Sequence, residues 1–202
     1  MERINTKNNI ENSNTSNTNH QDNYFIHLAR YMFCSRLIDK NEEVLEMGCG
    51  TGYGASLLSD FCKNVTAHDV WHHELENEWE KYNKPNLTFV KDLPNKKFDN
   101  IVSLEVLEHV PIPEVEDYFN TIKNSLSKNG TLYLSTPRYL PKEQRSQNRL
   151  NYHEKEYTQE ELKILLKKHF NNVYFFSQND ALISTHNPKM AWTFMTICTN
   201  KK

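Results

Sequence analysis

The chain has 202 residues, of which 37% are hydrophobic and 25% charged, and its formal net charge is −2. This length fits one domain with a hydrophobic core and is small for two domains. The near-neutral charge gives no electrostatic reason to expect a polyanionic partner such as nucleic acid, although a local basic patch would still permit one.

The sequence predicts a cytoplasmic protein without a membrane segment. Its N-terminus lacks the apolar stretch of a signal peptide, and no apolar run approaches the about 18 residues of a membrane span. The four cysteines show no Cys-x-x-Cys spacing, and they are Cys34, Cys49, Cys62 and Cys198. Most of them lie in apolar segments, which is typical of buried free thiols in a reducing compartment.

The N-terminal 20 residues differ in composition from the rest of the chain. They are almost all Asn, Ser, Thr and charged residues, with Ile4 and Ile10 as the only aliphatic side chains. So little apolar surface cannot offset the entropy of ordering, so we expect a disordered Asn-rich tail over residues 1–20. From Asp22, a plausible N-cap, apolar residues recur at helical spacing. We therefore expect a single domain over residues 21–202 that opens with a helix.

Four of the five glycines in the chain lie within seven residues, at positions 48, 50, 52 and 54. This turn follows an apolar run and precedes Ala55-Ser-Leu-Leu58, which indicates a strand, a tight loop and a helix. Glycine permits positive φ and a close approach of a ligand to the backbone. The N-terminus of the following helix offers unpaired N–H groups to an anion. We interpret the turn as a nucleotide-type cofactor loop.

The glycine spacing alone leaves the class of cofactor open. In the dinucleotide pattern Gly-x-Gly-x-x-Gly the third glycine, counted from Gly48, falls at Tyr53; counted from Gly50 it falls at Ala55, which a variant of the pattern accepts. Two carboxylates accompany the loop: Glu46 precedes the first glycine by two residues, and Asp69 ends a second predicted strand about 20 residues further on. A carboxylate at the second position can accept both ribose hydroxyls of an adenosine.

Helix and strand patterns alternate over the remainder of the chain. Helical patterns cover residues 71–82, residues 113–126 with Asn129-Gly130 as the C-cap, and a segment that opens with the capping box Thr158-Gln-Glu-Glu161. Strand patterns cover 87–90, 101–104, 131–135, 173–176 and 192–198. The alternation predicts an α/β fold with a parallel sheet and helices on both faces. The last two strands leave no room for a crossover helix, so the last strand should run antiparallel.

Taken together, these motifs resemble those of the class I S-adenosylmethionine-dependent methyltransferases, over roughly residues 24–200. The resemblance rests on the glycine loop with Glu46, on Asp69 and on Asp92-Leu93, Phe98 to His109 and Leu134-Ser-Thr-Pro137. It implies a Rossmann-like sheet of seven mostly parallel strands. It also implies S-adenosylmethionine as the cofactor, with Glu46 and the loop backbone at the methionine end, Asp69 at the ribose and Asp92 at the adenine. The full implied cofactor set is Glu46, Gly48, Cys49, Gly50, Thr51, Gly52, Asp69, Val70, Asp92, Leu93 and Leu104.

The motif Glu105-x-x-Glu108-His109 follows the fourth strand, at the edge where open α/β sheets bind ligands. If this turn is helical, the three side chains share one face. Ubiquinone-pathway O-methyltransferases and small-RNA 3′-terminal 2′-O-methyltransferases carry a similar motif and use it for metal. The resemblance therefore implies a divalent metal such as Mg²⁺ on Glu105, Glu108, His109 and His153, which would lower the pKa of a substrate hydroxyl. The alternative is catalysis without metal by Glu105 and His109, with the histidine as base.

The polar, basic segment from Arg138 to Arg149 is longer than the connection requires, and we interpret it as a lid over the substrate. The segment Tyr152 to Leu162 is similar to one in uncharacterised methyltransferases associated with surface-glycan pathways. The resemblance thus favours O-methylation of a small hydroxylated acceptor, a sugar or a phenol. Two alternatives are methylation of RNA 3′ ends, against which Arg138 stands where that family has Asn, and a non-catalytic S-adenosylmethionine-binding domain.

Overall fold

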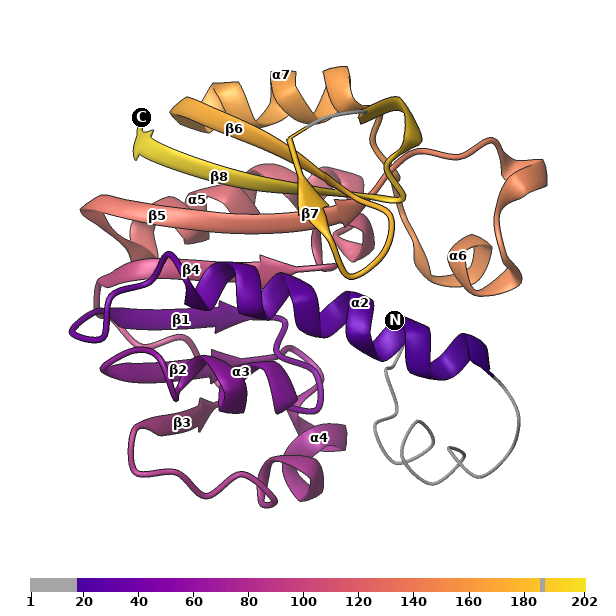
Figure 1. Ribbon diagram of the computed structural model, residues 1–202. Helices are drawn as coiled ribbons and strands as arrows, with labels where there is room; N and C mark the ends of the chain where they lie inside the picture. The colour runs from indigo at the N-terminus through magenta and orange to yellow at the C-terminus, as the bar shows by residue number, and fades with distance from the viewer. Residues whose placement is uncertain (1–17, 186–187) are drawn as a thin grey trace.

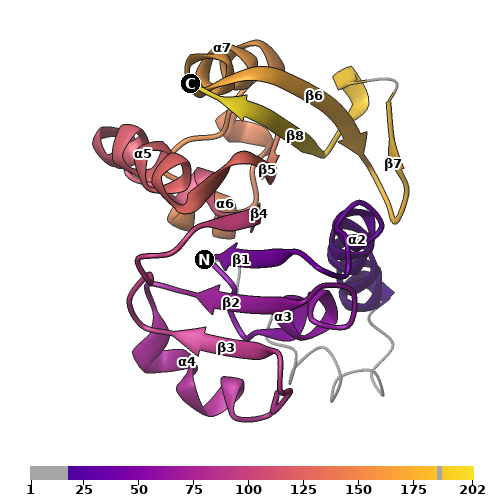
Figure 2. The same ribbon diagram turned by 90° about the vertical axis from the view of Figure 1, so that its left-hand side faces the viewer.

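A mixed sheet with helices on both faces forms the part of the chain that the computed structural model describes, residues 18–185 and 188–202 (Figure 1; Figure 2). The sheet order there is β3-β2-β1-β4-β5-β8-β6-β7. Strands β1 to β5 are parallel and span Glu43–Met47, Asn64–His68, Leu87–Val90, Phe98–Leu104 and Leu126–Pro137. Antiparallel pairing joins β8, Thr193–Lys201, to β5 and to β6, Phe170–Gln178, and joins β7, Ile183–Ser184, to β6.

The predicted α/β architecture, mostly parallel with an antiparallel last strand, is therefore confirmed. Strand β7 adds an eighth strand to the seven expected. It has only two residues, so it shows no alternation that a sequence pattern could reveal.

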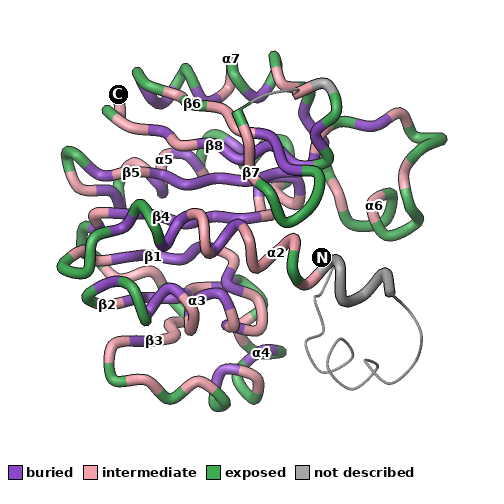
Figure 3. The backbone as a smooth tube through the Cα atoms, in the orientation of Figure 1, coloured by how far each residue is buried: buried purple, intermediate pink, exposed green. Residues whose placement is uncertain are grey.

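Side chains of successive strand residues enter two separate hydrophobic cores. In β1, Val44 packs with the helices on one face and Leu45 with those on the other, and Ile101 and Val102 of β4 divide in the same way. This follows from the period of two along a strand. The central strands are accordingly buried along most of their length, whereas exposed residues lie mainly in the loops and on helices such as α6 and α7 (Figure 3). The central strands thus form a rigid support for the loops at their carboxyl ends.

The α-helices of the described residues are α2 (Thr18–Ser35), α3 (Tyr53–Leu58), α4 (His72–Trp79), α5 (Val115–Ser125), α6 (Gln147–Tyr152) and α7 (Gln159–His169). Short 3₁₀ helices span Leu107–His109, Ile112–Glu114, Lys142–Gln144 and Pro188–Met190. The first core holds residues of α5 and α7, and the second holds residues of α2, α3 and α4. The predicted capping box of α7 is present, with Thr158 and Glu161 bonded reciprocally.

Two predicted helix ends are wrong. Helix α2 begins at Thr18, so Asp22 lies inside it and residues 18–20 of the expected tail are helical; the remainder of that tail, residues 1–17, lies outside the described residues. The first turn of α2 carries no apolar side chain, so apolar periodicity cannot mark it.

The other wrong end is that of α5, which ends at Ser125, before the predicted Asn129-Gly130 cap. Leu126 is already extended and buried, and β5 begins there. A Cβ at Gly130 would lie 2.8 Å from the Leu126 side chain and 3.0 Å from the Asp99 carbonyl oxygen. This glycine therefore permits close packing within β5 and does not cap a helix.

In the same described residues, no helix combines the length and the apolar character needed to cross a bilayer. The four cysteines are buried and free, as predicted.

Candidate active site

The glycine loop between β1 and α3 has the left-handed backbone that its composition predicts. Gly48, Gly50 and Gly52 have φ values of +76°, +52° and +88°. Two of them are also places of close approach: a Cβ would lie 2.4 Å from Val106 at Gly48 and 2.6 Å from the Phe89 ring at Gly52. At Gly50 a Cβ would meet no described atom within 4 Å. The Gly50 backbone therefore faces open space, which is the side from which a ligand can contact it.

Hydrogen bonds with two neighbouring elements hold the backbone of Gly50. The N–H of Gly50 donates to Asp69 Oδ2 at 2.9 Å, and Trp79 Nε1 of α4 donates to the Gly50 carbonyl at 2.9 Å. The other oxygen of the buried Asp69 accepts from the Trp71 N–H at 2.9 Å. The structure thus places Asp69 at the loop, where its carboxylate bonds the backbone.

The other predicted cofactor residues near this loop are of two kinds, buried and exposed. The side chains of Cys49, in the loop, and of Leu104, at the end of β4, are buried in the core formed with α2, α3 and α4. Leu93 is half-buried, whereas Asp92 is exposed and the Val70 side chain is 74% exposed. The exposed residues Val70 and Asp92 are therefore accessible to a ligand.

Glu46 is a buried acid on the floor of the loop. Its Oε1 accepts from the Tyr31 hydroxyl at 2.7 Å, while Oε2 has no hydrogen-bond partner among the described residues. Burial raises the pKa of Glu46 to about 8, and the charge of Asp69 adds to this, whereas the Tyr31 hydrogen bond opposes it. The hydroxyl oxygen of Thr51 in the same loop is also buried without a described partner. The loop therefore holds two buried oxygen atoms without a hydrogen-bond partner among the described residues.

The raised pKa predicts that Glu46 makes the ligand-free protein less stable as pH rises. Between its ordinary pKa of 4.5 and about 8 the folded chain keeps a proton that the unfolded chain has released. The free energy of unfolding should therefore fall by about 1.4 kcal/mol per pH unit from this residue alone. Urea unfolding of wild type and Glu46→Gln from pH 5 to 8 measures the difference, because glutamine keeps the Tyr31 bond without titrating. If the free energy of unfolding had the same pH dependence in both proteins, the raised pKa of Glu46 would be contradicted.

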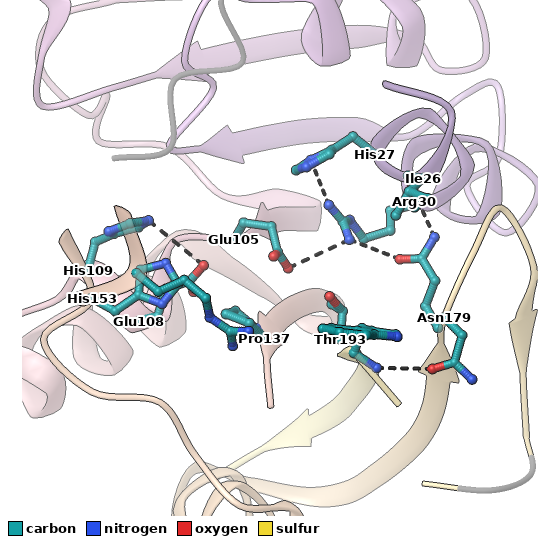
Figure 4. A pocket seen from close by; sticks show the side chains of 13 residues that line it. Ile26, His27, Arg30, Glu105, Glu108, His109, Pro137, His153, Asn179 and Thr193 are labelled. Atoms are coloured by element: carbon teal, nitrogen blue, oxygen red, sulfur yellow. Dashed lines mark hydrogen bonds and ion pairs between the residues drawn. The ribbon is translucent and has the colours of Figure 1, made fainter. Parts of the chain in front are cut away.

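A cavity of about 410 Å³ opens at the carboxyl ends of β4 and β5 (Figure 4). Val106, against which Gly48 packs, belongs to the turn that supplies part of its wall. The lining comes from α2, from the turn after β4, from the ends of β5, β6 and β8, and from the segment before α7. It consists of Ile26, His27, Arg30, Glu105, Glu108, His109, Pro137, Arg149, His153, Gln178, Asn179, Trp192 and Thr193.

The predicted shared face of Glu105, Glu108 and His109 is wrong. Glu105 has φ +57°, so the helical turn begins only at Leu107. The Glu105 N–H donates to the Ser135 carbonyl at 3.0 Å, and its Oε1 accepts from Ser135 Oγ at 2.7 Å. Glu105 consequently points toward Arg30, whose Nη1 lies 3.9 Å away, and not toward His109 (Figure 4).

Glu108, His109 and His153 do come together. One ligand atom from each lies within 4.8 Å of the others. His109 Nδ1 bonds the Tyr152 carbonyl at 2.8 Å, and because a carbonyl only accepts, this nitrogen carries the hydrogen. Neutral His109 therefore has its lone pair on Nε2, which lies 3.8 Å from Glu108 Oε1.

Burial sets the charge of this group. It lowers the pKa of His109, which favours the neutral ring, although the Tyr152 carbonyl opposes the shift. Burial, and then the charge of Glu105, raise the pKa of Glu108, whose Oε2 accepts from Thr136 Oγ1 at 2.9 Å. The group thus presents an unprotonated imidazole nitrogen at the cavity wall.

Arg30 of α2, a helix that the family resemblance places over the cofactor, is a buried charged residue in the wall of this cavity, and Glu156, which the sequence did not single out, is a buried acid behind it. Arg30 Nη1 donates to Gln178 Oε1 at 2.9 Å, and Nη2 lies 2.6 Å from Nδ1 of His27. Burial and the Arg30 charge lower the pKa of His27, which keeps its ring neutral as the acceptor. An arginine on the apolar stripe of α2, between Ile26 and Phe33, is the signal that marks this position.

Comparison with known proteins agrees with this architecture. Residues 19–174 match a family described as a methyltransferase domain. The chain belongs to the class I S-adenosylmethionine-dependent methyltransferase family. The ubiquinone biosynthesis O-methyltransferase of Rickettsia canadensis is 30% identical over 101 residues, which cover 46% of this chain and 42% of that protein. The methyltransferase domain thus matches less than half the length of this curated relative.

Two solved structures share the fold of this methyltransferase domain. The DhpI–SAH complex aligns with a TM-score of 0.66 and 16% identity, over 98% of this chain and 95% of that one. A chain of the Pnkp1/Rnl/Hen1 RNA repair complex aligns with a TM-score of 0.63 and 17% identity, over 86% and 41% of the two chains. At these identities the likeness concerns the fold, and the predicted family and architecture are confirmed.

Membership in this methyltransferase family implies S-adenosylmethionine as the cofactor. The loop residues fit such a group. Gly50 has an open side, and Glu46 Oε2 and Thr51 Oγ1 are buried polar atoms without described partners. A zwitterionic amino-acid tail supplies donors and acceptors to such atoms.

Proposed function

We propose that this chain transfers the methyl group of S-adenosylmethionine to a hydroxyl of a small acceptor bound in the 410 Å³ cavity. The observation that carries the proposal is the position of His109. Its Nε2 lies at a cavity that is partly walled by the turn after β4, and Val106 of the same turn packs on Gly48 of the glycine loop. The donor and a proton acceptor thus belong to adjoining sites.

The cofactor would occupy the open side of the glycine loop. Glu46 Oε2 and the backbone from Gly48 to Gly52 would hold its methionine end. Asp69 would accept the ribose hydroxyls with the lone pairs that its two backbone bonds leave available. Val70, Asp92 and Leu93 would surround the adenine. When bound, the sulfonium supplies the methyl group for an in-line displacement.

This chain then has two tasks, to orient the acceptor hydroxyl and to take its proton. Orientation in a closed site contributes up to about 7–11 kcal/mol in favourable cases. His109 Nε2 takes the proton, and the Tyr152 carbonyl holds the ring and stabilises the imidazolium that forms. The cavity volume lies within the about 300–1,000 Å³ of small-molecule sites, which supports a sugar or a phenol as the acceptor.

A second candidate is metal-dependent methyl transfer, including transfer to RNA 3′ ends. It is favoured by the grouping of Glu108, His109 and His153. The Nδ1 atoms of the two histidines are already hydrogen-bonded, so each Nε2 is the atom that can ligate a metal. A divalent ion there would lower the pKa of the acceptor hydroxyl. Glu105 is not among the grouped residues, so three residues would hold the ion in place of the four expected.

Calorimetry and a transfer assay test the proposed function. S-adenosylhomocysteine should bind with 1:1 stoichiometry, and labelled methyl groups should reach catechol or methyl glycosides in the presence of EDTA. Transfer that needs added Mg²⁺ or Mn²⁺ would favour the metal-dependent candidate, and transfer to an RNA oligonucleotide alone would favour RNA. Binding without transfer to any of these acceptors would contradict the proposal and favour a non-catalytic domain.

A further inference from the structure

The carboxylate of Glu156 lies at the centre of residues 138–157, the segment that connects β5 to α7 and includes α6 (Figure 1). Its side chain is completely buried. Three donors bond it: Arg149 Nε at 2.7 Å and His153 Nδ1 at 2.9 Å on Oε1, and the Leu140 N–H at 3.0 Å on Oε2. Arg145 Nε donates to the Leu140 carbonyl at 2.7 Å and forms an ion pair with Glu156 Oε2 at 3.2 Å. Arg145 and Arg149, two of the arginines in the predicted lid, are therefore held by one acid of the same segment.

This acid determines which nitrogen of His153 carries the hydrogen. An ionised carboxylate only accepts hydrogen bonds, so His153 Nδ1 must donate to Glu156. The neutral ring then has its lone pair on Nε2, the atom left for the cavity and for the group with Glu108 and His109. The hydrogen-bonded carboxylate fixes both the tautomer and the orientation of the ring.

The same segment also orders the opposite wall of the cavity. Its Tyr152 carbonyl accepts from His109 Nδ1 at 2.8 Å, as described above. The N–H groups of Glu154 and Lys155 donate to the Glu108 carbonyl at 2.7 and 3.2 Å. Docking of the segment therefore orders both imidazoles and the peptide of Glu108.

Stability alone does not explain a carboxylate at this position. Buried ion pairs contribute little net stability, because desolvation offsets their attraction, and an apolar side chain can fill the same volume. Two of the groups that Glu156 holds, Arg149 and His153, line the cavity. Both bond the same carboxylate oxygen, Oε1, so this acid couples their orientations.

We propose that Glu156 is a positioning residue, which sets the tautomer of His153 and holds residues 138–157 closed over the acceptor cavity. Its effect on methyl transfer rests on the proposed function, whereas its effects on the tautomer and on closure do not.

Nitrogen-15 NMR of the histidines in the wild-type protein tests the first part without any variant. The chemical shifts of His153 should show a hydrogen on Nδ1 and a bare Nε2 at a pH where the ring is neutral. A hydrogen on Nε2, or a mixture of both tautomers, would overturn the proposal even where substitution of Glu156 prevents folding.

The variant Glu156→Gln tests the second part, with Glu154→Gln as the matched control. The amide nitrogen of glutamine would face either Arg149 and His153 or the Leu140 N–H, and the donors on that side would lose their acceptor. Amide exchange across residues 138–157 should accelerate at least about tenfold, His153 should lose its single tautomer, and S-adenosylhomocysteine affinity should stay unchanged. Methyl transfer should fall about 10–100-fold in kcat. Because the side chain of Glu154 is exposed, we expect none of these changes in Glu154→Gln.

The outcomes separate the two proposals. A Glu156→Gln protein with wild-type exchange and a wild-type His153 tautomer overturns the positioning role, whatever its transfer rate. A chain that methylates none of the acceptors overturns the proposed function, while the tautomer and the exchange rates still decide the role of Glu156.

Discussion

The variant His109→Gln should bind S-adenosylhomocysteine with wild-type affinity and transfer methyl groups about 10²–10⁴-fold more slowly. Glutamine is similar in volume, and its carbonyl is far too weak a base to take a proton from a hydroxyl at neutral pH. The ring of His109 contacts the Tyr152 carbonyl and faces Glu108 and His153, so its replacement leaves the glycine loop unchanged. Calorimetry with S-adenosylhomocysteine and initial rates with labelled donor measure the two quantities.

The control for this variant is His73→Gln, which makes the same chemical change at an exposed position of α4. It should leave both affinity and rate unchanged. A His109→Gln protein that keeps the wild-type rate would remove His109 from the proton transfer and from any metal-dependent transfer.

Features fixed by neighbouring residues could be predicted from the sequence. The glycine loop has positive φ at Gly48, Gly50 and Gly52, which glycine adopts at the lowest cost, so the repeated glycines indicate this backbone conformation. The capping box of α7 involves residues three apart in the chain, Thr158 and Glu161. The alternation of strands and helices likewise requires the parallel sheet that is observed.

Features fixed by distant residues could not be predicted. Glu105 takes its left-handed conformation beside Ser135, 30 residues further along the chain, and this separates it from the group that the motif spacing suggested. Arg30 bonds Gln178 across 148 residues. Glu156 was missed for a different reason, since its partners are close in the chain. The acid lies in a polar segment where the sequence does not distinguish a buried carboxylate from a solvated one.

The variant Gly50→Asn should weaken S-adenosylhomocysteine binding by about 100-fold or more, which corresponds to about 3 kcal/mol of binding free energy. A Cβ at Gly50 points into the open space beside the loop, so any side chain there occupies the place proposed for the methionine end. The φ of +52° is one that asparagine tolerates, whereas alanine costs about 1–2 kcal/mol there.

Comparing Gly50→Asn with Gly50→Ala therefore separates backbone strain from occupation of the site. Urea unfolding should show that Gly50→Ala is the less stable of the two, while calorimetry should show that both have lost affinity. If affinity followed stability, so that Gly50→Asn bound as tightly as wild type, the cofactor would not contact the open side of this loop. Since Gly50 is held by Asp69 and Trp79 from the other directions, the methionine end would then have no remaining approach to its backbone.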